Sequence, residues 1–186
     1  MNPDRRLLLN ASAALGAAAL MGDAFAQPSP SYLDTAEPGK PGDFDFLSGN
    51  WKISHERQLK PGEWDRFEGE ATCWSILGGV ASIEELRIPA RDFSGMGLRT
   101  LDREKKIWSD YWMNAKFGVV GSEGVTGGFV RGEGVFLSDD MDGDTPIKVL
   151  GLWDAITASS CGWRQGVSRD GGKTWDWNWI MNWQRV

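Results

Sequence analysis

Hydrophobic and polar residues alternate along the final segment of the chain, which reads KTWDWNWIMNWQRV. Trp175, Trp177, Trp179 and Trp183 share one parity with Met181, and the other parity is mostly polar. A period of two is typical of a β-strand with two unlike faces. The segment is therefore predicted to be a strand with one face built largely of indole rings.

Short strand-like segments separated by turn residues fill the chain from residue 50 onward. The only helix-like piece is 43–49, about one or two turns long. Strands are predicted at 51–59, 66–77, 80–88, 97–102, 107–113, 147–156, 161–168 and 174–185, with 127–137 divided between two strands. The Asp-Gly pair at 142–143 is a hairpin signal. About nine or ten strands at this spacing predict an all-β antiparallel meander closed into an up-and-down barrel, with a sandwich as the alternative.

The N-terminal segment has the pattern of an export signal. Arg5 and Arg6 precede an Ala/Leu-rich stretch over 7–21, and a small-x-small site ends at Ala26. We expect residues 1–26 to be a twin-arginine-like signal peptide and the mature protein to be periplasmic or secreted. The apolar run of about fifteen residues is short for a bilayer, so no membrane span is expected after signal removal.

Composition narrows the function classes. Four prolines and no periodicity predict a flexible linker at 27–42, followed by one domain at 43–186. A net charge of −6 without a Lys/Arg cluster argues against nucleic acid as a partner. The two cysteines lie on predicted strands that are not neighbours, and a disulfide between them is left open. The single histidine and the cysteine spacing fit no zinc site, so neither a metal ion nor another cofactor is expected.

The segment FLSGNWKI contains a Gly-x-Trp motif that resembles the opening of the lipocalin and calycin barrels. In that superfamily the Trp packs across the barrel floor, and an Arg near the end of the barrel stacks over it. The matching residues are Gly49, Trp51 and Arg185. A guanidinium on an indole face forms a cation–π contact, and its donors can bind nearby carbonyl groups.

The region 43–186 also resembles a bacterial family of exported, uncharacterised calycin-like proteins. The similarity lies in FDFLSGNWKI, SCGWRQGVSRDGGKTW and the closing NWIMNWQRV. It implies the barrel fold and no established activity. The stretch SRDGGKTW matches one Asp-box of the sialidases, but a propeller needs many copies, so a hairpin turn around Asp170 is predicted.

Several polar residues are candidates for the barrel interior. His55 and Arg57 share parity with Trp51, and either both point inward or a bulge turns them outward. Charged residues are rarely buried without partners. The candidate partners are Glu84 or Glu85, Asp110 and Tyr111, and Arg99, Arg164 and Gln165 have the same ambiguity.

If Arg185 reaches Trp51, parity carries the whole tryptophan series inward. Buried indole N–H groups need partners, which favours a lined cavity over a solid core. We expect extracytoplasmic binding of a small, flat, apolar or aromatic ligand, with a homo-oligomer left open. The expected ligand-binding residues are Arg57, Arg99, Tyr111, Trp153, Trp163, Gln165, Trp177 and Trp179. One alternative is an enzyme (isomerase, lyase or hydrolase) with His55 as acid/base and Glu85 or Asp110 beside it; another is carbohydrate binding.

Overall fold

The computed structural model describes residues 36–186; the predicted signal peptide and the first part of the predicted linker lie outside the described residues. A 3-10 turn, η2 (Asp45–Leu47), precedes an almost continuous series of strands, with further 3-10 turns η3 (Leu77–Gly79) and η4 (Pro89–Arg91). The strands are β1 (Gly49–Lys60), β2 (Glu63–Ile76), β3 (Ala81–Ile88), β4 (Phe93–Asp102), β5 (Ile107–Asn114), β6 (Val119–Val120), β7 (Val125–Val130), β8 (Glu133–Asp142), β9 (Thr145–Asp154), β10 (Ser160–Ser168) and β11 (Asp176–Arg185).

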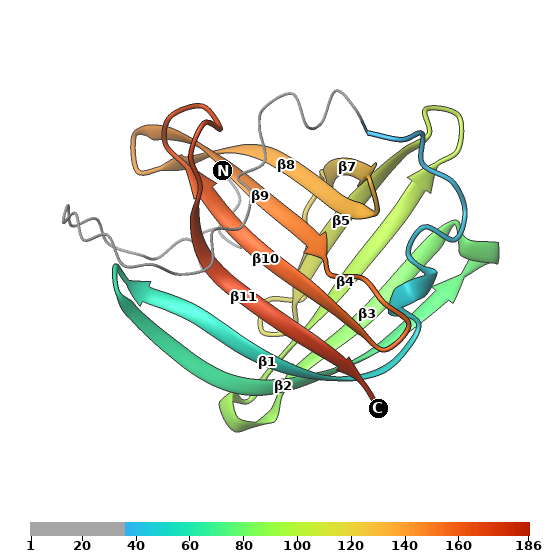
Figure 1. Ribbon diagram of the computed structural model, residues 1–186, viewed down its shortest axis with the longest axis horizontal. Helices are drawn as coiled ribbons and strands as arrows, with labels where there is room; N and C mark the ends of the chain where they lie inside the picture. Colours follow the sequence, from blue (N-terminus) through green and yellow to red (C-terminus); the bar gives the residue numbers. More distant parts are fainter. Residues whose placement is uncertain (1–35) are drawn as a thin grey trace.

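The strands form one antiparallel sheet that closes on itself (Figure 1). Ten of the eleven strands make the barrel, because β1 pairs with β11 and β4 pairs with β5. Among the described strands, the remaining one, β6, pairs only with the end of β5. The predicted all-β antiparallel up-and-down barrel is confirmed.

The predicted strand positions agree with the observed ones apart from their ends. The segment 127–137 divides into parts of β7 and β8, as predicted, and the chain turns between them at Arg131 and Gly132, whose φ angles are 53° and 83°. The Asp-Gly signal at 142–143 forms the β8–β9 hairpin. The two-residue β6 had no prediction, because a segment this short carries no measurable periodicity.

Trp51 and Arg185 close one end of the barrel as the Gly-x-Trp motif predicted. They are direct partners in the β1–β11 register, and the Arg185 guanidinium lies 4.2 Å from the centroid of the Trp51 ring. Its Nη2 donates to Phe46 O at 2.6 Å, its Nε to Ala158 O at 2.8 Å, and its Nη1 to Ser48 O. Gly49 leaves room for this side chain, because a Cβ there would collide with Nη1.

Aromatic side chains fill the barrel interior next to this closed end. Phe44 packs edge-on to Trp108 with ring centroids 4.9 Å apart, and Trp153 and Trp183 lie 5.5 Å apart. All four rings are almost completely buried, together with Trp51. This half of the barrel is therefore a solid hydrophobic core.

The last part of the predicted linker lies against the closed end. Glu37 N donates to Phe129 O, Gly39 N to Lys106 O and Gly42 N to Gly79 O. Asp43, at the start of the predicted domain, accepts a hydrogen bond from Trp108 Nε1 at 3.0 Å. Within residues 36–186, no helix is long and apolar enough to cross a bilayer.

A β-bulge divides the tryptophan series of β11 between the two faces of the sheet. Gln165 of β10 pairs with Trp179, but the next residue, Gly166, pairs with Trp177, so that Asn178 is the extra residue. An extra residue reverses which face the following side chains occupy. The prediction that Trp175 and Trp177 point inward with Trp179 is therefore wrong. Both pack in a separate cluster with Val130, Val135, Leu150 and Leu152.

That cluster lies on the outer face of the sheet. In β9, Val149, Gly151 and Trp153 line the interior, so the intervening Leu150 and Leu152 point outward. Trp177 lies against Gly166, where an added Cβ would come within 3.1 Å of its ring. Two indoles of the stripe thus cover β8–β10 from outside, and the rest face the interior.

Candidate functional site

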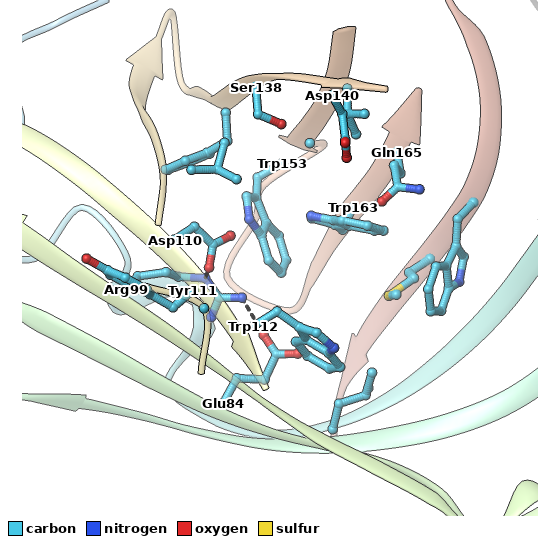
Figure 2. A pocket seen from close by; sticks show the side chains of 18 of the residues that line it. Glu84, Arg99, Asp110, Tyr111, Trp112, Ser138, Asp140, Trp153, Trp163 and Gln165 are labelled. Carbon is cyan, nitrogen blue, oxygen red and sulfur yellow. Dashed lines mark hydrogen bonds and ion pairs between the residues drawn. The ribbon is translucent and has the colours of Figure 1, made fainter. Parts of the chain in front are cut away.

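The half of the barrel away from Arg185 contains a cavity of about 200 Å³ (Figure 2). Its walls come from strands β3, β4 and β5 and from strands β7 to β11. The lining residues are Glu84, Leu86, Arg99, Asp110, Tyr111, Trp112, Gly121, Glu123, Val125, Phe136, Ser138, Asp140, Val149, Gly151, Trp153, Trp163, Gln165, Trp179, Met181 and Trp183.

Five of the lining residues are tryptophans. Trp163 of β10 and Trp179 of β11 meet edge to face, with centroids 6.0 Å apart and planes at 88°. Trp153 and Trp183 form the boundary between the cavity and the solid core. Large flat side chains around a small space provide contact area for a flat apolar molecule.

A charged cluster lies within this apolar wall and consists of Glu84, Arg99 and Asp110 (Figure 2). Arg99 of β4 is 3% exposed, and its Nη2 donates to Glu84 Oε2 at 2.5 Å. Asp110 of β5 is the register partner of Arg99, and its Oδ1 lies 3.5 Å from Arg99 Nε. That separation gives Coulomb attraction but is too long for a good hydrogen bond.

Burial and neighbouring charge act in opposite directions on these groups. Burial disfavours the charge of Arg99, but the Asp110 and Glu84 carboxylates outweigh it and raise the pKa of Arg99 above its usual value. Burial raises the pKa of Asp110 to about 6; Arg99 opposes this shift and Glu84 adds to it. Arg99 is therefore a permanent cation, while Asp110 changes charge near neutral pH.

Four buried donors at the inner end of the cavity have no acceptor among residues 36–186. They are Arg99 Nε, Arg99 Nη1, Trp153 Nε1 and Trp183 Nε1. A buried donor left unpaired costs about 1–3 kcal/mol. A bound molecule with hydrogen-bond acceptors would recover part of that cost.

Polar residues surround the opposite end of the cavity. Gln165 is buried, and its Nε2 donates to Asn178 Oδ1 at 3.1 Å, so the bulge residue positions it. Ser138 and Asp140 of β8 project from the same side, with Trp163 below them (Figure 2). Glu123 adds a second carboxylate to the lining here.

His55 points inward, as one of the two alternatives predicted, but it does not line the cavity. It is 1% exposed and stacks on Phe67 with ring centroids 4.6 Å apart. Trp179 Nε1 donates to His55 Nδ1 at 3.2 Å. Burial, and to a smaller extent the charge of Arg91, lower the pKa of His55 to about 4. His55 is therefore a neutral acceptor that orients the Trp179 indole.

Arg57 lies one inward position further along β1. Its guanidinium is 5.0 Å from the Trp179 ring centroid, on the strand next to it, and Arg57 does not line the cavity. Nearby, Arg91 stacks over Phe67 at 3.6 Å and pairs with Asp65. Arg57, Arg91 and Phe67 therefore lie near His55, at the end of the barrel away from Arg185.

The structure does not assemble the predicted catalytic group of His55, Glu85 and Asp110. Glu85 points to the outside of the barrel, where it pairs with Arg87 at 2.8 Å, and Glu84 occupies the interior instead. A signal for this difference exists in the sequence, because Glu84 shares parity with the apolar Leu86 and Ile88. Asp110 lies in the cavity wall, whereas His55 lies outside the lining.

Six of the eight predicted ligand-binding residues line the cavity: Arg99, Tyr111, Trp153, Trp163, Gln165 and Trp179. Trp177 lies on the outer face and Arg57 beside Trp179. The site prediction did not include Glu84, Trp112, Phe136, Met181, Trp183 and the polar residues Glu123, Ser138 and Asp140. Parity alone could have suggested Trp112, because it is two residues from Asp110 and therefore lies on the same face of the strand.

Neither cysteine takes part in the cavity. Cys73 and Cys161 are free and buried in the core on β2 and β10, which are separated by β1 and β11. Burial raises the pKa of the Cys161 thiol to about 12. Among residues 36–186, no group of three or more His, Cys, Asp or Glu side chains is arranged to hold a metal ion.

No protein-family model matches this chain, and no curated protein sequence matches it. Among solved structures, the chain is similar to a redesigned β-barrel at 10% sequence identity, with 80% of this chain and 98% of the designed chain covered and a TM-score of 0.43. This distant likeness carries no argument about function.

Proposed function

We propose that this protein binds a small, flat, largely apolar or aromatic molecule inside the barrel. The observation that carries the proposal is a cavity walled by indoles with unpaired donors at its inner end. Indole side chains that only filled a core would leave no such space. The ligand would lie between Trp163, Trp179 and Trp153.

The size of the cavity sets the size of the ligand. An engineered apolar cavity of about 150 Å³ in another protein holds benzene. The cavity here measures about 200 Å³ and has an open polar end. One ring or two fused rings would therefore fit, whereas a larger polycyclic molecule would require the barrel to open.

Binding is favoured over the two alternatives on geometry. An enzyme with His55 as acid/base would need that imidazole to reach the ligand, and His55 lies outside the lining residues. A sugar would need polar partners along its whole rim, while the middle of the cavity is mainly aromatic. Neither alternative has a specific observation in its support.

The location outside the cytoplasm is part of the proposal and rests on residues 1–26 alone. The Arg pair, the Ala/Leu-rich run and the small-x-small site support export. Membership of the exported calycin-like family is likewise proposed, from FDFLSGNWKI and the closing NWIMNWQRV.

Naphthalene is a suitable probe for the proposed function because it has two fused rings and no polar group. Ligand-observed NMR titration should show saturable binding to the native protein. Trp179→Phe should weaken the affinity for naphthalene roughly threefold to tenfold, because the smaller ring offers less contact area in the cavity wall. Trp177→Phe is the matched control, since this indole lies on the outer face of the same strand, and it should bind like the native protein.

Equal losses of naphthalene affinity in the two variants would overturn the proposal, as would the absence of saturable binding by naphthalene and by polar bicyclic compounds of similar size. A separate experiment, mass spectrometry of small molecules that co-purify with the protein from its native compartment, would identify the natural ligand. A flat molecule of one or two rings is the expected result.

A further inference from the structure

We propose, resting on the proposed function, that the inner end of the cavity recognises an uncharged ligand in which a hydrogen-bond acceptor lies next to a donor. The simplest flat group of this kind is a cyclic amide. Its carbonyl oxygen would accept from Arg99 Nη1, and its N–H would donate to the Asp110 carboxylate. The juxtaposition of Arg99 and Asp110 on neighbouring strands carries this proposal.

Arg99 provides the donor side of the site. Of its three guanidinium nitrogens, only Nη2 has a hydrogen-bond partner in the part of the chain that the structure describes, the carboxylate of Glu84. The side chain packs against two aromatic rings, since its guanidinium lies 5.1 Å from the Trp153 ring centroid and 5.5 Å from that of Phe44. A fixed, buried guanidinium with unused donors is a preorganised binding group, because little side-chain freedom is lost on binding.

Asp110 provides the acceptor side. Its side chain keeps 23% exposure while Arg99 and Glu84 keep 4% each, so Asp110 is the most accessible member of the cluster. Its contact with Arg99 Nε at 3.5 Å leaves carboxylate lone pairs free for a closer donor. Acceptor and donor functions therefore lie side by side at one end of an aromatic cavity.

The charge of the lining selects against an anionic ligand. Two carboxylates, Glu84 and Asp110, already face one guanidinium. Within residues 36–186 the lining adds Glu123 and Asp140 but no second cation. An additional carboxylate beside Arg99 would meet like charges at short range in a poorly solvated space. A neutral acceptor can use the Arg99 donors without that repulsion.

Four bicyclic probes of similar size test this inference on the native protein. Naphthalene has no polar group, 2-quinolone carries adjacent C=O and N–H groups, 2-naphthoate is an anion, and N-methylquinolinium is a cation. Two added hydrogen bonds should make 2-quinolone bind about tenfold more tightly than naphthalene. We expect 2-naphthoate to bind at least about tenfold more weakly than 2-quinolone.

Asp110→Leu provides the matched variant, because it removes the acceptor and leaves the Arg99–Glu84 pair intact. The advantage of 2-quinolone over naphthalene should fall by at least about threefold. Ser138→Ala, at the opposite end of the cavity, should leave this ratio unchanged. If Asp110→Leu fails to fold, the comparison of probes on the native protein decides the question alone.

The outcomes separate the two proposals. Failure of every probe to bind would overturn the proposed function and this inference together. Naphthalene binding as tightly as 2-quinolone would leave the proposed function standing and overturn only the recognition of a paired acceptor and donor. Tightest binding by 2-naphthoate or by N-methylquinolinium would also overturn it, in favour of an anionic or a cationic ligand.

Discussion

Replacement of Arg185 by alanine is the sharpest test of how the barrel is closed. The side chain connects three backbone segments, because it donates to carbonyl groups of Phe46, Ser48 and Ala158 and covers the Trp51 ring. Arg185→Ala would leave all three carbonyls without this partner and would expose one face of the indole. We expect the turn η2 to lose its attachment to the last strand.

The magnitude follows from these contacts. Hydrogen bonds that involve a charged donor contribute about 1.5–3 kcal/mol each when buried. The carbonyl acceptors here are only partly buried, so water can replace much of that energy. The cation–π contact adds about 0.5–2 kcal/mol. A net loss of about 2–3 kcal/mol in the free energy of unfolding is therefore expected, which corresponds to a fall in Tm of roughly 5–10 °C for a domain of this size.

Urea denaturation followed by tryptophan fluorescence measures this loss. Arg185→Lys should recover only part of it, because one ammonium group cannot reach three carbonyls around the ring. Arg169→Ala is the control: this exposed residue pairs with Asp142 and Asp176 at the surface, and its removal should change the free energy of unfolding by less than about 0.5 kcal/mol. A value for Arg185→Ala as small as that of the control would refute the closure argument.

Three further predictions concern packing, pH and processing. Gly127→Ala should lower the free energy of unfolding by about 1–3 kcal/mol, because its Cβ would overlap a backbone carbonyl oxygen of β8. Gly128→Ala, the control, should be nearly neutral, and equal denaturation midpoints for the two variants would contradict this reasoning. The lowered pKa of His55, about 4, gives stability that is complete above pH 6.5 and is lost as the pH falls toward 4. The raised pKa of Asp110, about 6, gives stability that is complete below pH 3.8 and is lost as the pH rises through 6. Between pH 7 and 5 these two effects oppose each other. In urea titrations, acidification should therefore stabilise His55→Gln and destabilise Asp110→Asn relative to the native protein. If the free energy of unfolding changed with pH in the same way in all three proteins, the two pKa shifts would be disproved. N-terminal sequencing of exported protein should begin at Gln27, and a cytoplasmic protein that keeps the whole N-terminal segment would count against export.

Local pattern was sufficient to predict the barrel and its closed end. Alternation and turn residues place the main strands, because side chains of a strand must alternate between two faces and chain reversals need particular backbone angles. The resemblance of the Gly-x-Trp motif and the final arginine to the lipocalin and calycin barrels predicted the contact between Trp51 and Arg185, which are direct partners in the β1–β11 register. The strand positions depend on residues close in sequence, and the contact between Trp51 and Arg185 depends on the first and last strands, which pair when the barrel closes.

The charged site was only partly predictable. The sequence left open whether Arg99 points inward and whether its partner is Glu84 or Glu85, although Glu84 shares parity with the apolar Leu86 and Ile88. The structure resolves the ambiguity through β3 pairing, which places Glu84 opposite Gly97 on the inner face, where the absence of a side chain leaves room for the Arg99–Glu84 pair.

The faces of the tryptophan series were decided by tertiary structure alone. Trp175 and Trp177 share parity with Trp179 and Trp183, so the sequence determines a strand rich in indole but not where its faces exchange. The exchange occurs at Asn178, where pairing with β10 skips one residue. A bulge is a property of two paired strands and their packing, and no period within one strand records it. Sequence alone thus determined the barrel and its aromatic content, while strand pairing decided which indoles surround the cavity and which cover the outside.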